Sequence, residues 1–322
     1  MFFMEKYAII IAIIILFLVA IFVFLIPFIC FYMAFYVRNK DKKLKGEFDM
    51  PPGKIYKPYH NQMKIWMQKM RNTKSEDVCI TSFDGLKLHA KYYEGIKGAP
   101  VEIMFHGYRG SAERDLCGGI QRSFEVKRNV LLVDQRASMQ SEGNVISFGI
   151  NESKDCLKWI EFINKKFNGN VQIYLTGVSM GASTVLMATS YDLPSNVVGV
   201  VADCGYSSVK DIICKVIKQM HLPPKLAYPF LKLGARLYGK FNLDELNPVD
   251  AVKKCKIPVI FFHGDKDDFV PCEMSKQNYE ACASKKRLVI IKGAGHGLGY
   301  CVEPQKYVEE IKNFEEECLK LS

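Results

Sequence analysis

Six short apolar runs, spaced along the chain between residues 101 and 293, constrain the fold more than any other feature of the sequence. They are VEIMF (101–105), NVLLVD (129–134), VQIYLTG (171–177), VVGVVAD (197–203), PVIFFHG (258–264) and RLVIIKG (287–293). Stretches with helical spacing accompany them at 152–166, 180–190, 273–283 and 304–320. Continuous apolar runs of this length are typical of parallel strands that helices cover on both faces. The pattern therefore predicts a doubly wound, mostly parallel α/β sheet.

Three further segments extend this pattern. Residues 77–93 alternate apolar and polar side chains around Asp84-Gly85, which predicts a β-hairpin, and a short helix with an apolar face at Trp66 and Met70 is expected before it. Roughly fifty residues separate the run that ends at Asp203 from the run that begins at Pro258, which is too many for one crossover helix. The apolar, helically spaced sequence at 220–241 predicts a helical cap inserted at about 207–256.

The N-terminal segment contains no charged side chain between Tyr7 and Val37. This run exceeds the roughly 20 residues needed to cross a bilayer, and we predict a transmembrane anchor over 1–37, a basic linker over 38–58 and one large folded domain over 59–322. A cleaved signal peptide is the alternative, but its apolar region would be shorter and no small-x-small cleavage site follows. Lys6 alone precedes the span, whereas five cations follow it: Arg38, Lys40, Lys42, Lys43 and Lys45. The positive-inside rule predicts a single-pass protein of the cell membrane with its domain in the cytoplasm.

The net charge of +10 does not by itself indicate nucleic acid, because the clearest cationic cluster lies beside the predicted span. Anionic lipid accounts for such a cluster, and no DNA- or RNA-recognition motif occurs. The ten cysteines after the span have no paired spacing that would indicate a disulfide framework or a zinc site. We expect reduced thiols and no metal.

A candidate nucleophile lies in LTGVSMGAS, residues 175–183. Ser179 is expected in the tight turn between a strand ending at Gly177 and a helix beginning by Met180, which is the context that gives Gly-x-Ser-x-Gly chemical meaning. A serine hydroxyl needs a base, and the base needs a carboxylate to orient it. His296, flanked by two glycines, follows the last strand and is the expected base.

The carboxylate is expected in DKDDFVP, after the strand at 258–264, where three acids compete: Asp265, Asp267 and Asp268. Two backbone N–H groups are expected to form the oxyanion hole, those of Met180 and of Tyr108 in the early loop FHGYRGS. His106 in that loop is expected to be a structural turn residue.

These motifs resemble those of the α/β-hydrolase superfamily over residues 76–320. The serine-hydrolase branch related to serine aminopeptidases and monoacylglycerol lipases is the most similar, including bacterial hydrolases of unassigned substrate. The resemblance rests on FHGYRGS, VDQRASMQSEG, GVSMG, HGDKDDFVP and GAGHG. It implies an α/β-hydrolase fold with a short helical cap, no metal or organic cofactor, and Asp267 as the acid. One departure is that Ala137, Ser138 and Met139 occupy positions where the family more often has Gly-His-Gly.

The sequence thus predicts a membrane-anchored serine hydrolase that cleaves an ester or related acyl bond, with an acyl substrate that the apolar cap and anchor suggest is lipid-like. Two alternatives stay open. One is a peptidase of the serine aminopeptidase type, and the other is a membrane-attached binding protein that has kept the scaffold without catalysis.

Overall fold

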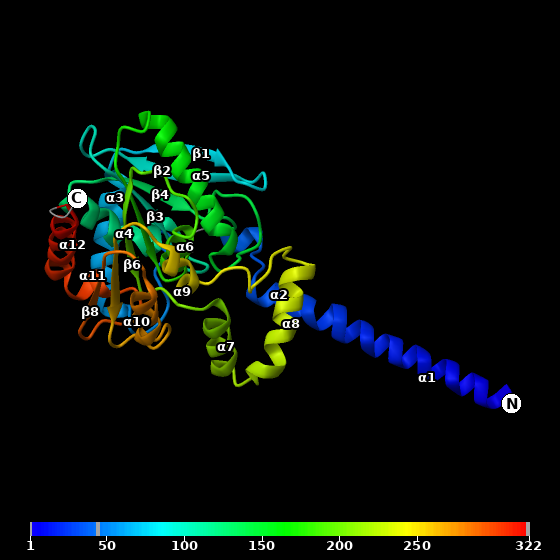
Figure 1. Ribbon diagram of the computed structural model, residues 1–322. Coiled ribbons are helices and arrows are strands. Elements are labelled where there is room, and N and C mark those ends of the chain that lie inside the picture. The colour runs from blue at the N-terminus through cyan, green and yellow to red at the C-terminus, as the bar shows by residue number, and fades with distance from the viewer. Residues whose placement is uncertain (1, 43–45, 320–322) are drawn as a thin grey trace.

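The computed structural model describes residues 2–42 and 46–319, and its centre is one eight-stranded sheet (Figure 1). The strands are β1 (Glu76–Thr81), β2 (Lys87–Tyr93), β3 (Val101–Phe105), β4 (Asn129–Asp134), β5 (Ile173–Val178), β6 (Val197–Asp203), β7 (Val259–Gly264) and β8 (Lys286–Ile291). Their order across the sheet is β1-β2-β4-β3-β5-β6-β7-β8. Strand β2 is antiparallel to both its neighbours, and β3 to β8 are parallel. The predicted doubly wound, mostly parallel α/β sheet is confirmed.

Helices cover both faces of the sheet. One face carries α3 (His60–Asn72), α4 (Ala112–Glu125), α11 (Gly299–Val302) and α12 (Pro304–Leu319), and the other carries α5 (Ile150–Phe167), α6 (Met180–Ala188), α9 (Pro248–Ala251) and α10 (Cys272–Ala281). Helix α4 was not among the helices expected from the sequence. Its first turn is capped by the Ser111 hydroxyl, which accepts from Arg114 N at 3.2 Å, and its apolar face buries Leu116 and Ile120.

The core lies on both sides of the sheet because successive strand side chains point to opposite faces. In β4, Val130 and Leu132 pack into the cluster below α4, whereas Leu131 and Val133 join the larger cluster that contains Trp159 of α5. All of β3 and β4 is buried, which explains why their sequences are continuously apolar rather than alternating.

The N-terminal segment forms one long apolar helix that projects away from the rest of the protein (Figure 1). It consists of α1 (Phe2–Ala20), a π-helical turn η1 (Ile21–Leu25) and α2 (Ile26–Ala34). Residues Glu5–Ala34 are long and apolar enough to cross a membrane. By length and composition alone, this helix is a candidate for a membrane anchor or a signal sequence.

The end of this helix is part of the folded domain. The Phe35 side chain is fully buried, and its ring meets those of Phe148 and Phe241 edge-on, with centroids 5.7 Å and 5.3 Å away. Val37 N donates to Asn144 O at 2.8 Å. The anchor boundary expected at residue 37 therefore falls inside a packed cluster.

The segment expected to be a basic linker also lies partly on the domain. Phe48, Met50 and Tyr56 pack against Met63 and Met67 of α3. Two cations of the expected basic cluster, Lys43 and Lys45, lie outside the described residues.

The long interval between β6 and β7 contains the two longer helices α7 (Val209–Gln219) and α8 (Pro224–Leu237), followed by the short α9. Figure 1 shows α8 lying across the base of the N-terminal helix. Gly234 makes this approach possible, since a Cβ at this position would lie 2.3 Å from Pro27 O. The Tyr238 hydroxyl donates to Phe24 O at 3.0 Å and adds a polar contact at the same junction.

Candidate active site

Ser179 lies in a sharp turn between β5 and α6, at the carboxyl edge of the sheet. Its φ of 57° and ψ of −118° are unusual for a residue with a side chain. The flanking glycines permit this turn, because a Cβ on Gly177 would lie 2.1 Å from Gly181 C and a Cβ on Gly181 would lie 2.0 Å from Phe105 O. Ser179 N donates to Asp203 O at 2.8 Å, which fixes the turn to the end of β6.

The structure brings Ser179, His296 and Asp267 into one hydrogen-bonded line. His296 Nε2 lies 2.9 Å from Ser179 Oγ, and His296 Nδ1 lies 2.7 Å from Asp267 Oδ2. The carboxylate can only accept, so we assign Nδ1–H as the donor to Asp267 and Nε2 as the acceptor for the Ser179 hydroxyl. This is the tautomer that a general base requires.

Asp267 is the one acid of the three competing aspartates that contacts His296 in this way. Its Oδ1 accepts from Phe269 N at 2.9 Å and Val270 N at 2.8 Å, while Oδ2 also lies 3.2 Å from His263 Nε2. Burial raises the pKa of Asp267, but the hydrogen bonds from His263 and His296 outweigh burial, so the net pKa is lowered. Asp267 is therefore ionised at neutral pH. Asp265 instead accepts from Gly293 N at 2.6 Å.

His263 was not singled out as a site residue by the sequence. It is fully buried at the end of β7, where Nε2 faces Val270 O at 2.9 Å and Nδ1 lies 2.6 Å from Ser275 Oγ. Its ring thus lies beside Asp267, with Nε2 near the same Oδ2 atom that His296 Nδ1 contacts. The signal in the sequence was its position in HGDKDDFVP, four residues before Asp267.

The loop after β3 passes directly against the nucleophile. A Cβ on Gly107 would lie 3.5 Å from Ser179 Cβ. Gly107 N donates to Asp115 Oδ2 at 2.9 Å, so a carboxylate in the first turn of α4 holds the loop. Met180 follows Ser179 in the chain, and Tyr108 follows Gly107, which lies against Ser179 in space. Binding of an oxyanion by their N–H groups stays a prediction.

His106 contributes to the same loop as a turn residue. Its Nε2 accepts from Gln135 N at 3.1 Å, and its Nδ1 faces Gly107 O at 2.8 Å. Burial lowers its pKa, so the ring stays neutral and joins the loop after β3 to the end of β4.

The departure from the family pattern at 137–139 leaves the loop in a conformation suited to glycine. Ala137 has a φ of 61° and Met139 a φ of 44°, both in the left-handed region. The two side chains therefore accept backbone strain that glycine would avoid. Ser138 Oγ donates to Gly110 O at 2.9 Å and joins this loop to the loop after β3.

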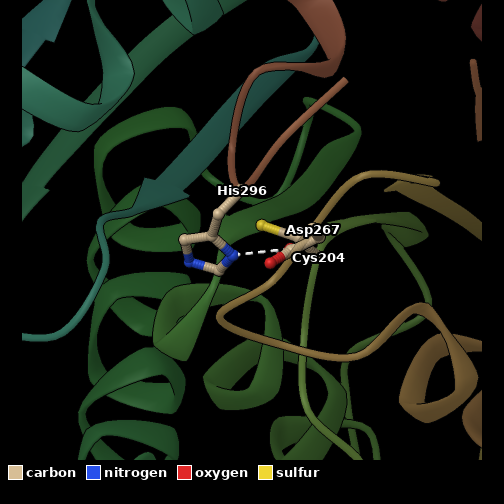
Figure 2. Close-up of side chains that lie close together, drawn as sticks. All are labelled: Cys204, Asp267 and His296. Carbon is tan, nitrogen blue, oxygen red and sulfur yellow. Dashed lines mark hydrogen bonds and ion pairs between the residues drawn. The ribbon is translucent and has the colours of Figure 1, made fainter. Parts of the chain in front are cut away.

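Cys204, directly after β6, lies beside Asp267 and His296 (Figure 2). The ligand atoms of Cys204, Asp267 and His296 lie within 4.8 Å of one another, a grouping that could in principle hold a metal ion. Burial raises the pKa of the Cys204 thiol well above its usual range, whereas metal binding needs the thiolate. Both Asp267 oxygens already accept hydrogen bonds, and the arrangement fits a proton-transfer triad better than a metal site.

The site is nearly closed to solvent. Ser179 is 7% exposed and His296 is 9% exposed. The Phe269 ring meets the His296 imidazole edge-on at 5.1 Å between centroids, and the Tyr108 ring lies 5.1 Å from that of Phe148. A cavity of about 750 Å³ lies elsewhere, where Tyr174, Cys255 and Phe314 line the amino end of the sheet.

The fold and the site define an α/β-hydrolase. Residues 147–322, which include Ser179, Asp267 and His296, match the model of the prolyl oligopeptidase family, and the chain belongs to this family. By family and fold, it is a serine hydrolase of the α/β class.

Similar proteins agree with this class. The uncharacterized protein YqkD of Bacillus subtilis is 27% identical over 187 residues, which cover 58% of this chain and 61%, less than two thirds, of that protein. The alpha/beta hydrolase domain-containing protein WAV2 of Arabidopsis thaliana is 25% identical over 222 residues, 65% of this chain and 67% of that one. The esterase Pf2001 of Pyrococcus furiosus shares the fold with a TM-score of 0.64 at 23% identity, over 77% of this chain and 93% of the esterase.

Proposed function

We propose that this chain is a membrane-anchored serine hydrolase that cleaves an ester or related acyl bond. The observation that carries the proposal is the continuous line of hydrogen bonds from Ser179 Oγ through His296 to Asp267. A neutral imidazole that accepts from the serine and donates to an ionised carboxylate can take the serine proton as attack begins.

The first half of the reaction forms an acyl-enzyme. Ser179 Oγ attacks the carbonyl carbon while its proton moves to His296 Nε2, and the negative charge moves onto the carbonyl oxygen. The N–H groups of Tyr108 and Met180 bind this oxyanion. The tetrahedral intermediate then expels the alcohol, which takes the proton from His296 as the carbon–oxygen bond breaks.

The second half restores the enzyme. His296 removes a proton from water, whose oxygen attacks the acyl carbon, and the proton returns to Ser179 as the carboxylic acid leaves. Asp267 stays ionised throughout and stabilises the imidazolium that forms twice in the cycle.

The location and substrate class follow from the apolar helix and the cap. We place α1 in the cell membrane as a single-pass anchor, with the domain in the cytoplasm beside the cations that follow the span. The apolar cap and the anchor favour an acyl substrate of lipid-like character. Protease protection of an engineered C-terminal tag in intact cells tests this orientation, because external protease would remove the tag if the domain faced outward.

The catalytic proposal is tested on the full-length protein in detergent or nanodiscs. We expect a fluorophosphonate probe to label Ser179 and short p-nitrophenyl esters to be cleaved. Ser179→Ala should abolish both, whereas Ser190→Ala, which changes a half-buried serine just beyond α6, should label like the wild type. Absence of labelling, or equal labelling of Ser179→Ala, would contradict the proposal and favour a binding protein that keeps the scaffold.

A peptidase is the second candidate, and membership of the prolyl oligopeptidase family favours it. The same triad can attack an amide, with His296 protonating the leaving amine instead of an alcohol. Turnover of aminoacyl amides relative to fatty esters by the unlabelled wild-type protein separates the two activities.

A further inference from the structure

The outward face of the cap carries an apolar stripe. In α8, the residues at i, i+4, i+7 and i+11 share one side of the helix. Together with the turn before α8, they form the cap stripe: Met220, Leu222, Leu226, Phe230, Leu233 and Leu237. Leu226 is 67% exposed, and Met220 and Leu222 are each 48% exposed. Such a stripe on a protein surface marks a contact site.

The opposite side of α8 is already used. Tyr228, Leu231 and Ala235 are buried in the cluster that also contains Met180, next to the nucleophile, and Phe35 at the end of the N-terminal helix. The cap stripe is thus the face of an amphipathic helix that the domain itself leaves uncovered.

The cap stripe is continuous with the surface of the proposed membrane anchor. Phe230 lies against Phe22 with ring centroids 6.1 Å apart, and Phe22 is itself 53% exposed. Gly234 and Tyr238 hold α8 against the same stretch of the N-terminal helix. A lipid that contacts Phe22 can therefore also contact Phe230, because the two side chains form one apolar surface.

The segment that carries the cap stripe is rich in cations. Residues 212–243 contain no Asp or Glu and carry six cations: Lys215, Lys218, Lys225, Lys232, Arg236 and Lys240. Four of these are exposed, and Lys232 pairs with Asp244, just beyond the segment. An amphipathic helix with apolar residues on one face and cations at its margins is suited to the interface of an anionic bilayer.

We propose that the cap stripe docks on the same bilayer that holds the anchor, with its cations on anionic headgroups. The proposal rests on the membrane anchoring proposed above and deepens it, because helix α8 then lies between lipid and the cluster that contains Met180. The substrate is accordingly an acyl group carried by a membrane lipid.

The test uses the full-length protein in nanodiscs of phosphatidylcholine and phosphatidylglycerol, with or without bromine on the acyl chains. Leu226→Trp places a fluorophore on the cap stripe. Ile96→Trp is the matched control, since Ile96 is also apolar and 48% exposed but lies before β3, at the edge of the sheet away from Ser179. The native Trp66 and Trp159 also emit, and this background emission is measured on the wild-type protein.

An interfacial helix sits about 5–10 Å into the headgroup and acyl boundary, so brominated lipid should remove roughly half of the emission added by Leu226→Trp and little of that added by Ile96→Trp. Adding Lys225→Glu and Arg236→Glu should reduce the quenching if anionic headgroups hold the helix. Equal quenching at the two positions would overturn the proposal. It would also be overturned if cross-linking showed that a second copy of the protein covers the cap stripe and so prevents quenching at position 226.

Two controls separate this inference from the proposed function. Fluorophosphonate labelling without quenching would support the proposed hydrolase and refute docking of the cap stripe. Quenching without labelling would support docking and refute the proposed hydrolase. Failure of the protein to float with vesicles would refute the anchor and docking together.

Discussion

Gly234 gives the sharpest test of how the N-terminal helix joins the cap. In Gly234→Ala, the new Cβ would lie 2.3 Å from Pro27 O and 3.1 Å from Phe31 Cβ, and the first contact is with backbone that cannot turn aside. Forcing a methyl group into a filled interface costs about 1–3 kcal/mol, against a gain of at most about 1 kcal/mol from the better helix propensity of alanine. We expect a net loss of about 1–2 kcal/mol of unfolding free energy. For a domain of this size, that lowers Tm by about 2–8 °C.

Gly119→Ala is the matched control for this substitution. Gly119 also lies inside a helix, but its Cβ would meet only Met104 Sδ at 3.5 Å, which is ordinary contact. Here the propensity gain of about 0.5–1 kcal/mol has no opposing clash, so Tm should rise slightly. Thermal unfolding of the three full-length proteins in one detergent measures both effects. If Gly234→Ala were as stable as Gly119→Ala, the close approach of α8 to α2 would not exist in solution.

Further substitutions test the triad and the core. Asp267→Asn should lower kcat by about 10⁴-fold with esters, because His296 loses the partner that selects its tautomer. Because the pKa of Asp267 is lowered in the folded state, the ionised carboxylate stabilises the fold above about pH 3.9, and this contribution is lost as the pH falls through the lowered pKa. Melting curves across that range should show the Tm of the wild type and the Tm of Asp267→Asn converging in acid. Burial raises the pKa of Glu102, but Arg122 and Arg128 outweigh it and bring the value to about 2. Glu102→Gln should therefore cost about 3–5 kcal/mol in urea unfolding, because it removes the buried carboxylate that pairs with both guanidinium groups. Iodoacetamide should modify exposed Cys79 well before Cys204 in the folded protein, as mass spectrometry can measure, because burial raises the pKa of the Cys204 thiol.

The sequence was sufficient to predict the parallel strands and the triad members that the structure brings together. Strands buried on both faces have continuous apolar sequences. The three predicted site residues lie in loops after three of these strands, in the order Ser179, Asp267 and His296. The choice of Asp267 over its neighbours came from a family resemblance, not from the residues alone. The structure supplies the physical basis for this choice in the hydrogen bond from His296.

Other features depend on spatial arrangement and could not be predicted from local sequence. Helix α4 carries Gly118-Gly119 at its centre, which lowers its intrinsic helix propensity, and its packing against α3, β3 and β4 stabilises it. Cys204 reaches the triad because β6 lies beside β5 with Asp203 opposite Val178. The apolar sequence around Phe35 is equally consistent with a side chain that faces lipid and with one in the protein core. The contacts of Phe35 with Phe148 and Phe241 show that it lies in the core.

The order of synthesis constrains how Phe35 reaches its place. A chain leaves the ribosome from its N-terminus, so the apolar helix and Phe35 emerge long before Phe148, and longer still before Phe241. The aromatic site for Phe35 is complete only when most of the chain has been made, and contacts between such distant residues form slowly. The helix is therefore free to enter a bilayer before its partners exist. With the membrane anchor proposed above, the domain would finish folding at the bilayer surface, around a segment that is already fixed there.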